Sequence, residues 1–171
     1  MQSLSKHERT KQDLCRLVVD LATFLLENDL RLTTAESCTG GLISAACTDL
    51  AGSSDWFERG FVTYSNAAKT ELLGVDAALI EAHGAVSEQV ARAMAFGAIR
   101  HSAAQVSISV TGIAGPSGGS AAKPVGTVWF GFSVQGSLLS EMQRFEGDRA
   151  SVRSQTVIHA LQRVLELLSA D

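Results

Sequence analysis

The sequence predicts an α/β fold, a single-domain three-layer α/β/α sandwich with a mixed sheet. Short β-type segments alternate with amphipathic helical segments along most of the chain, which is typical of a parallel sheet covered by helices. Near the C-terminus two β-type segments flank a Gln135-Gly136 turn, so an antiparallel hairpin is expected to extend that sheet. The length of 171 residues fits one domain, 1–171, with a core of about 11–168.

Each expected element has its own signal in the sequence. Leu14, Leu17 and Leu21 recur at helical spacing in the first helix, and a stripe of valines and leucines marks the last. The segment 106–110 alternates apolar and polar residues, as a strand with one buried face does. Glycines after the first strand indicate a tight turn and a helix that starts at Ser37. In order, we expect helix 11–28, strand 31–35, a helix from Ser37, a strand from Phe57 to near 65–66, a short helix carrying Lys69, helix 87–100, strands 106–110, 125–134 and 138–145, and helix 148–168.

The composition excludes several classes of protein. With 46% hydrophobic and 19% charged residues, the chain can bury a substantial core and lacks the signature of disorder. Fourteen basic residues against eighteen acidic ones give a net charge of -4, so we expect no nucleic-acid partner and no membrane-surface binding. The longest apolar stretch, 14–26, is interrupted by Arg16 and Asp20, which argues against a membrane span. The polar first dozen residues do not resemble a signal peptide, so we expect a cytoplasmic protein.

The cysteines and histidines give no sign of a metal or of disulfides. Cys15, Cys38 and Cys47 are odd in number and form no Cys-x-x-Cys pair, so we expect three free thiols. The four histidines lack the spacing of metal ligands, and His83 is expected in a turn as a surface or structural residue. We therefore expect neither a metal nor another cofactor.

Three polar clusters directly follow predicted strands. They lie around Ser37, at Tyr64 to Lys69, and at Thr111 to Gly119. Ligands of α/β sheets bind beyond the carboxyl ends of the strands. We therefore expect the three clusters to share one crevice.

The first two clusters contain the groups that amide hydrolysis needs. Ser37 is a candidate nucleophile, although a serine before a helix is more often its N-cap. A desolvated Lys69 could accept the serine proton and Tyr64 could orient or relay it, whereas the ordinary interpretation of Lys69 is a solvated helix lysine. Cys38 is a weaker nucleophile candidate, because free cysteines are usually buried and inert. Glu36 could act as a general base, bind a ribose hydroxyl, or serve as a structural carboxylate.

The third cluster is a glycine-rich loop. Closely spaced glycines let backbone N–H groups approach a phosphate or an oxyanion. The loop matches neither the P-loop nor the dinucleotide-binding pattern, and a strand rather than a helix follows it. A flexible surface loop is an equally good interpretation of the bare pattern. Lys123 near the loop and Arg149 near the start of the last helix could contact a phosphate, or either could be a surface cation.

Four ordered blocks of the sequence resemble one family. They are 34–41 (TAESCTGG), 60–66 (GFVTYSN) with Lys69, 83–87 (HGAVS), and 112–116 (GIAGP) with 123–128 (KPVGTV). In these blocks the chain is similar to the C-terminal domain of the competence-damage-inducible CinA family, the nicotinamide-nucleotide amidases. The resemblance runs from the first helix to the last, and the length leads us to expect the stand-alone form of this domain.

The resemblance implies a nicotinamide mononucleotide deamidase, which hydrolyses the nicotinamide carboxamide to nicotinic acid mononucleotide and ammonia in pyridine nucleotide recycling. It implies Ser37 as nucleophile, Lys69 as its base and Tyr64 as their partner in proton transfer, without a metal or another cofactor. The expected substrate-binding residues are Glu36, Thr39, Gly40, Thr111, Gly112, Gly115 and Arg149. For the phosphate, Arg144 and Lys123 are alternatives to Arg149.

Two other functions stay open on the sequence. A module that only binds a nucleotide needs no nucleophile and base, so the joint presence of Ser37 and Lys69 argues against it. A serine–lysine amidase acting on a non-nucleotide amide would carry the same pair. As partners we expect a small-molecule substrate and further copies of this chain, that is a homo-oligomer and in the simplest case a dimer.

Overall fold

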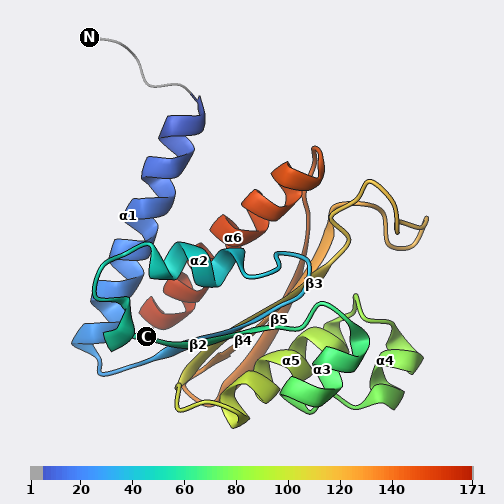
Figure 1. Ribbon diagram of the computed structural model, residues 1–171, viewed down its shortest axis with the longest axis horizontal. Coiled ribbons are helices and arrows are strands. Elements are labelled where there is room, and N and C mark those ends of the chain that lie inside the picture. Colours follow the sequence, from blue (N-terminus) through green and yellow to red (C-terminus); the bar gives the residue numbers. More distant parts are fainter. Residues whose placement is uncertain (1–5, 171) are drawn as a thin grey trace.

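The computed structural model describes residues 6–170. Its elements are α1 (Lys6–Glu27), β1 (Leu32–Glu36), α2 (Leu42–Thr48), a short 3₁₀ turn (Ser53–Asp55), β2 (Phe57–Val62), α3 (Asn66–Leu73), α4 (Ala77–His83), α5 (Glu88–Arg100), β3 (Val106–Gly112), β4 (Thr127–Val134), β5 (Ser137–Arg144) and α6 (Arg149–Ser169). The strands form one sheet in the order β2-β1-β3-β4-β5. Strand β1 pairs in parallel with β2 and β3, whereas β4 is antiparallel to both β3 and β5. Helices cover both faces of the sheet, so the predicted sandwich with a mixed sheet is confirmed (Figure 1).

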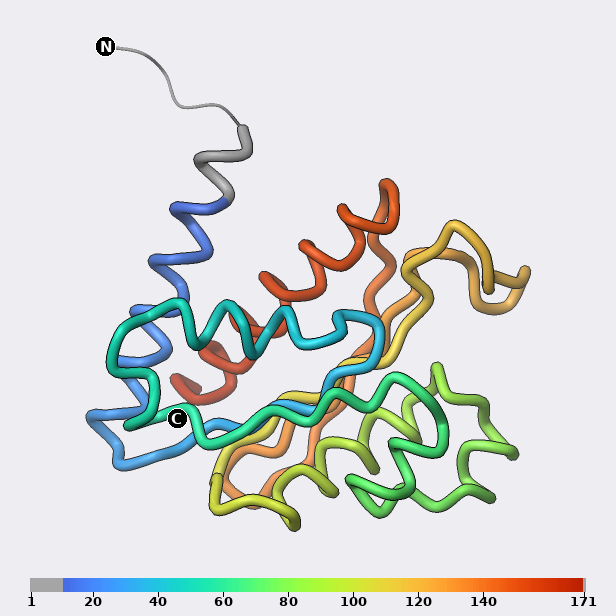
Figure 2. Tube along the Cα trace, viewed as in Figure 1, coloured from blue at the N-terminus to red at the C-terminus, as the bar shows by residue number. Residues whose placement is uncertain are grey.

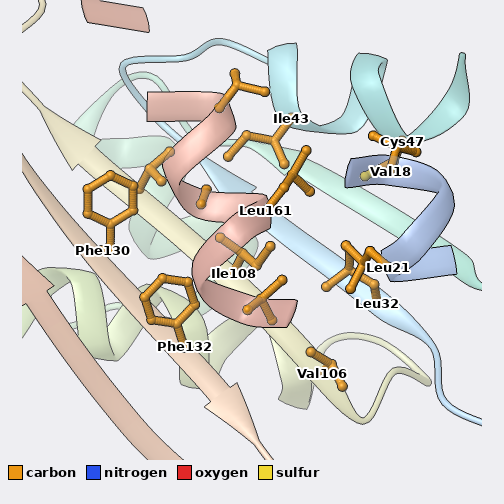
Figure 3. Packing of buried hydrophobic residues seen from close by; sticks show 14 of the residues in the cluster. Val18, Leu21, Leu32, Ile43, Cys47, Val106, Ile108, Phe130, Phe132 and Leu161 are labelled. Carbon is orange, nitrogen blue, oxygen red and sulfur yellow. The ribbon is translucent and has the colours of Figure 1, made fainter. Parts of the chain in front are cut away.

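Each face of the sheet has its own hydrophobic core. Helices α1, α2 and α6 cover one face, where Leu21, Ile43 and Leu161 are buried with the apolar side chains of the strands (Figure 3). Helices α3, α4 and α5 cover the other face, where Leu73 and Met94 are buried. The trace in Figure 2 shows the two long helices near the chain ends on the same side of the sheet. Burial of this apolar surface is the main stabilising contribution to such a fold.

The sheet brings three strand ends to one edge. Glu36, the last residue of β1, pairs with Val62 at the end of β2 and with Val110 in β3. Because these three strands are parallel, the residues that follow them emerge side by side. The loops that carry the three polar clusters therefore start from adjacent points.

Most expected elements are confirmed with their ends shifted by a few residues, but α4 was not predicted. His83 is the last residue of this helix instead of lying in a turn. Only one side chain of the helix, Ile80, is buried. A seven-residue helix with one buried side chain leaves too little periodicity for recognition from sequence.

The prediction that a helix begins at Ser37 is wrong. Helix α2 begins at Leu42, five residues later. Gly40 and Gly41 intervene with φ values of 61° and 98°, in the left-handed region that a right-handed helix cannot include. Ser37 therefore belongs to a turn between β1 and α2, and it is not the N-cap of the helix.

The prediction that β3 has only one buried face is also wrong. Six of its seven residues are buried, because α5 packs against the face that carries the serines. The hydroxyl of Ser107 donates to the Ala95 carbonyl at 2.8 Å, and that of Ser109 donates to the Ala91 carbonyl at 2.6 Å. The polar residues of this strand thus reflect hydrogen bonding to a helix rather than contact with water.

Candidate active site

The three polar clusters meet in one cavity of about 240 Å³ at the carboxyl ends of the parallel strands. The prediction of a shared crevice is therefore confirmed. The cavity is lined by Ser37, Cys38, Tyr64, Asn66, Lys69, Ala85, Val86, Thr111, Gly112, Ala114 and Arg149. Larger hollows on the surface contain neither Ser37 nor Lys69.

Ser37 and Lys69 form a hydrogen-bonded pair in this cavity. Lys69 Nζ lies 3.1 Å from Ser37 Oγ and donates a second hydrogen bond of 2.9 Å to the Thr63 carbonyl. The backbone N–H of Ser37 donates to the Val110 carbonyl at 3.0 Å, which fixes the serine to β3. Residues 32 positions apart are thus held at the distance that a nucleophile and its base require.

The lysine is buried although it carries an amine. Its exposed fraction is 1%, and no carboxylate of residues 6–170 forms an ion pair with it. Burial disfavours the ammonium form, so the pKa of Lys69 is lowered from its ordinary value. A lowered pKa increases the population of neutral amine, which can accept the hydroxyl proton of Ser37.

Local sequence explains how α3 delivers this lysine. The Ser65 side chain caps the helix by accepting a hydrogen bond from the Ala68 N–H. Lys69 follows the cap by four residues, about one helical turn. Its Nζ reaches the Thr63 carbonyl, which directly follows β2. The expected short helix carrying Lys69 is confirmed.

Cys38 directly follows Ser37, but its thiol is expected to be unreactive. The thiol is buried, and burial raises its pKa to about 12. Since the thiolate is the nucleophilic form of cysteine, this residue stays protonated and inert near neutral pH.

Tyr64 and Arg149 form a second pair at the rim of the cavity. Arg149 Nη2 donates to the Tyr64 hydroxyl at 2.9 Å, and its Nη1 donates to the Gly115 carbonyl at 3.0 Å. The tyrosine is 61% exposed, and the hydrogen bonds of the described chain connect its hydroxyl to neither Ser37 nor Lys69. The geometry therefore links Tyr64 with Arg149 rather than with the Ser37–Lys69 pair.

Glu36 lies behind the serine and not in the cavity. Its side chain has no exposed area. The carboxylate accepts hydrogen bonds from the hydroxyl of Thr39, the N–H of Gly41 and further groups of α2. The structure thus brings neither Glu36 nor Thr39 nor Gly40 to the cavity wall, and it gives the carboxylate a structural surrounding.

Of the remaining predicted binding residues, Thr111 and Gly112 line the cavity, whereas Lys123 and Arg144 do not. Thr111 lines the cavity and donates to the Ala85 carbonyl at 2.7 Å, while Gly112 continues the same wall. Lys123 Nζ donates to the His83 carbonyl at 3.0 Å, and Arg144 is exposed at the end of β5. Among the lining residues, Arg149 and Lys69 are the two cations.

Two residues near the site were missed from the sequence. Asn66 lines the cavity as the first residue of α3. Arg153 donates from Nη2 to the Thr39 carbonyl at 2.8 Å. It follows Arg149 by four residues, so both arginines lie on one face of α6, and that spacing was the available signal.

The described part of the chain contains no group of three or more metal-ligating side chains. None of the helices within it is long and apolar enough to cross a membrane.

The fold and the site together define a class of protein, α/β domains with a serine–lysine pair at the carboxyl ends of parallel strands. The chain belongs to the CinA C-terminal domain family, which it matches over residues 15–168. The family that the four sequence blocks indicated is thereby confirmed.

Two relatives and one solved structure match this chain along nearly their whole length. The Enterobacter agglomerans protein named nicotinamide-nucleotide amidohydrolase PncC is 55% identical over 157 residues, covering 91% of this chain and 96% of that protein. The protein of the same name from Escherichia coli K12 is 49% identical over 154 residues, with coverages of 90% and 93%. A solved structure of a competence/damage inducible protein from Agrobacterium tumefaciens superposes with a TM-score of 0.89 at 42% identity, covering 99% of this chain and 100% of that one.

Proposed function

We propose that the protein hydrolyses the carboxamide of nicotinamide mononucleotide to nicotinic acid mononucleotide and ammonia. The observation that carries the proposal is the 3.1 Å contact between Lys69 Nζ and Ser37 Oγ in a cavity formed by strand ends. The names of relatives 49% and 55% identical to this chain support the substrate class.

The reaction follows from the positions of the two catalytic residues. Ser37 Oγ attacks the carboxamide carbon while its proton passes to Lys69, whose burial favours the neutral amine. The C–N bond then breaks, and the departing nitrogen takes the proton back from Lys69 and leaves as ammonia. Water attacks the acyl-serine with the same lysine as base, which releases the carboxylate and regenerates Ser37.

Arg149 is the residue that we assign to the phosphate of the nucleotide. It lies on the rim of the cavity that contains Ser37, whereas Lys123 and Arg144 do not line that cavity. A guanidinium offers paired N–H donors that match phosphate oxygens. Binding energy from the remote phosphate would orient the carboxamide for attack, so free nicotinamide should be a poor substrate.

An ammonia-release assay with nicotinamide mononucleotide, free nicotinamide and simple amides tests the proposal. We expect ammonia from the mononucleotide at a rate well above that from the other amides. Equal rates on simple amides would instead favour a general serine–lysine amidase. Binding of the mononucleotide without any ammonia would favour a module that only binds nucleotides.

The expected assembly and location are part of the same proposal. Val19 and Leu26 on α1 are 40% and 52% exposed, and contact with a second copy would bury such side chains. Light scattering at micromolar concentration should therefore give a multiple of the 18.0 kDa chain mass, and a monomer would contradict the homo-oligomer. Cell fractionation tests the cytoplasmic location.

A further inference from the structure

Ser37 opens a tight backbone turn, residues 37–41, which we call the nucleophile turn. Its first residue is fixed to β3 through the Val110 carbonyl, and the Gly40 N–H closes the turn by donating to the Ser37 carbonyl at 3.1 Å. Gly40 and Gly41 both have left-handed backbone conformations. The shape of this turn thus depends on two glycines and on the groups that hold them.

One side of the nucleophile turn rests on Glu36. The carboxylate accepts from the Thr39 hydroxyl at 2.7 Å and from the Gly41 N–H at 3.1 Å. It also accepts three hydrogen bonds from Ile43 and Ser44 at the start of α2. A buried carboxylate with this many donors orients the turn but is not available to a substrate.

Arg153 from α6 makes a second contact with the turn. Its Nη2 donates to the Thr39 carbonyl at 2.8 Å, across 114 positions of sequence. The position that a Cβ on Gly40 would occupy lies 3.6 Å from the same nitrogen. Within the described residues, the Nε atom of Arg153 is buried and has no hydrogen-bond partner. The Thr39 carbonyl of the turn is therefore the hydrogen-bond acceptor of this guanidinium.

Two backbone N–H groups of the turn are left without an acceptor in the described chain. Those of Ser37, Gly40 and Gly41 are bonded, whereas those of Cys38 and Thr39 are not. Cys38 is 5% exposed and lines the cavity, whereas Thr39 has no exposed area and does not line it, so of the two residues only Cys38 is at the cavity wall. Burial has the largest effect on the Cys38 thiol and raises its pKa, but the Cys38 N–H lies close enough to the thiol to favour its charged form.

We propose that the N–H group of Cys38 is an oxyanion donor of this site, and that Glu36 and Arg153 are positioning residues that hold it in place through their contacts with Thr39 and Gly41. The inference rests on the proposed amidase function. As Ser37 Oγ bonds to the carboxamide carbon, the π electron pair of the C=O bond moves to oxygen and the serine proton moves to Lys69. The resulting oxyanion accepts a hydrogen bond from the Cys38 N–H, which the folded turn holds in place before the reaction.

The test replaces Arg153 and follows Ser37 with two reagents. Diisopropyl fluorophosphate forms a P–O bond with Ser37 Oγ and loses fluoride, while the proton passes to Lys69 and negative charge develops on the phosphoryl oxygen. Nicotinamide mononucleotide reports turnover, and the product nicotinic acid mononucleotide reports ground-state binding. Arg163→Met is the matched control, because this arginine lies on the same helix and pairs with Glu141 and Glu166 instead.

We expect Arg153→Met to lower both kcat and the labelling rate about 10- to 100-fold, less than the roughly 10²- to 10³-fold of losing a donor outright. KM and the affinity for the product should stay within about twofold, since the substrate contacts are unchanged. Arg153→Lys keeps a donor near the Thr39 carbonyl and should recover part of both rates. Arg163→Met should behave as wild type.

Three outcomes would overturn the inference. One is slow turnover of Arg153→Met with an unchanged labelling rate. The second is weaker product binding with an unchanged kcat, which would make Arg153 a substrate contact. The third is a folded Arg153→Lys variant whose turn has shifted but whose Ser37 is labelled at the wild-type rate. This result decides the matter if Arg153→Met does not fold. Wild-type protein that is labelled at Ser37 but releases no ammonia would contradict the proposed function alone.

Discussion

The Arg149 guanidinium donates a 2.9 Å hydrogen bond to the Tyr64 hydroxyl, so residues 85 positions apart meet at the rim of the cavity. This contact places the phenol beside the residue assigned to the phosphate, whereas family resemblance implies a role for Tyr64 in proton transfer. The two roles have different kinetic consequences.

Tyr64→Phe separates them. If the hydroxyl orients Arg149, its loss should raise KM roughly 10-fold, the order expected for one hydrogen bond to a charged group, with little change in kcat. Steady-state kinetics on nicotinamide mononucleotide measure both quantities. A large fall in kcat at constant KM would support proton transfer by Tyr64 instead.

Ser37→Ala and Lys69→Ala should each abolish ammonia release, because each removes one half of a single nucleophilic unit. The double variant should be little worse than either single variant. Circular dichroism serves as the control for folding. Turnover near the wild-type level in either single variant would exclude the serine–lysine mechanism.

Arg149→Ala should lower kcat/KM for nicotinamide mononucleotide by about one to two orders of magnitude, which corresponds to the roughly 1.5–3 kcal/mol of a charge-assisted contact. The residual activity of this variant on nicotinamide riboside, which lacks the phosphate, should barely change. Arg144→Ala is the matched control, since that arginine is exposed and does not line the cavity. Equal losses of kcat/KM on both substrates would mean that Arg149 acts on catalysis or folding. A loss of kcat/KM on the mononucleotide in Arg144→Ala would instead assign the phosphate to Arg144.

Activity should rise with pH through the lowered pKa of Lys69, because the neutral amine is the base. The same shift affects stability. Between the lowered pKa and about 10.5, the unfolded chain holds a proton on this residue that the folded chain lacks, so stability rises with pH. In thermal melts, the Tm of wild type minus that of Lys69→Met should increase as the pH rises through this range. A Tm difference independent of pH would contradict the lowered pKa.

Activity should survive chelators and thiol reagents. Cys15 is exposed, whereas Cys38 and Cys47 are buried, and burial raises the pKa of both buried thiols. A thiol reagent should therefore modify one cysteine in the native protein and three after denaturation, with turnover retained in the native sample. Loss of turnover on chelation that a metal ion restores would contradict the proposed chemistry.

The arrangement of strands was predictable because alternation and turn residues are local signals. The shared cavity was predictable too, since it requires only parallel strands and polar residues at their ends. Other features depended on partners distant in sequence. Ser107 and Ser109 suggested a solvent-facing side of β3, but α5 covers them and accepts their hydrogen bonds.

The surroundings of the serine show the same limit. The residues around Ser37 indicated a helix start, but two consecutive left-handed glycines delay α2 to Leu42. The sequence left both a ligand-binding and a structural role open for Glu36, and only the folded turn shows that backbone and hydroxyl donors surround its carboxylate. The partner of Arg153 is 114 positions away, so no local pattern could indicate it.

The contacts made by α6 also bear on when a growing chain becomes competent. Ser37, Thr63 and Lys69 come from the first half of the chain, so synthesis delivers the catalytic pair early. Arg149 and Arg153 are made about 80 positions later, and they reach the site only when α6 docks on the sheet. A nascent chain that ends before residue 149 would carry the Ser37–Lys69 pair without Arg149 at the cavity rim and without the Arg153 contact to the turn. Competence for the reaction thus requires that synthesis has passed through α6.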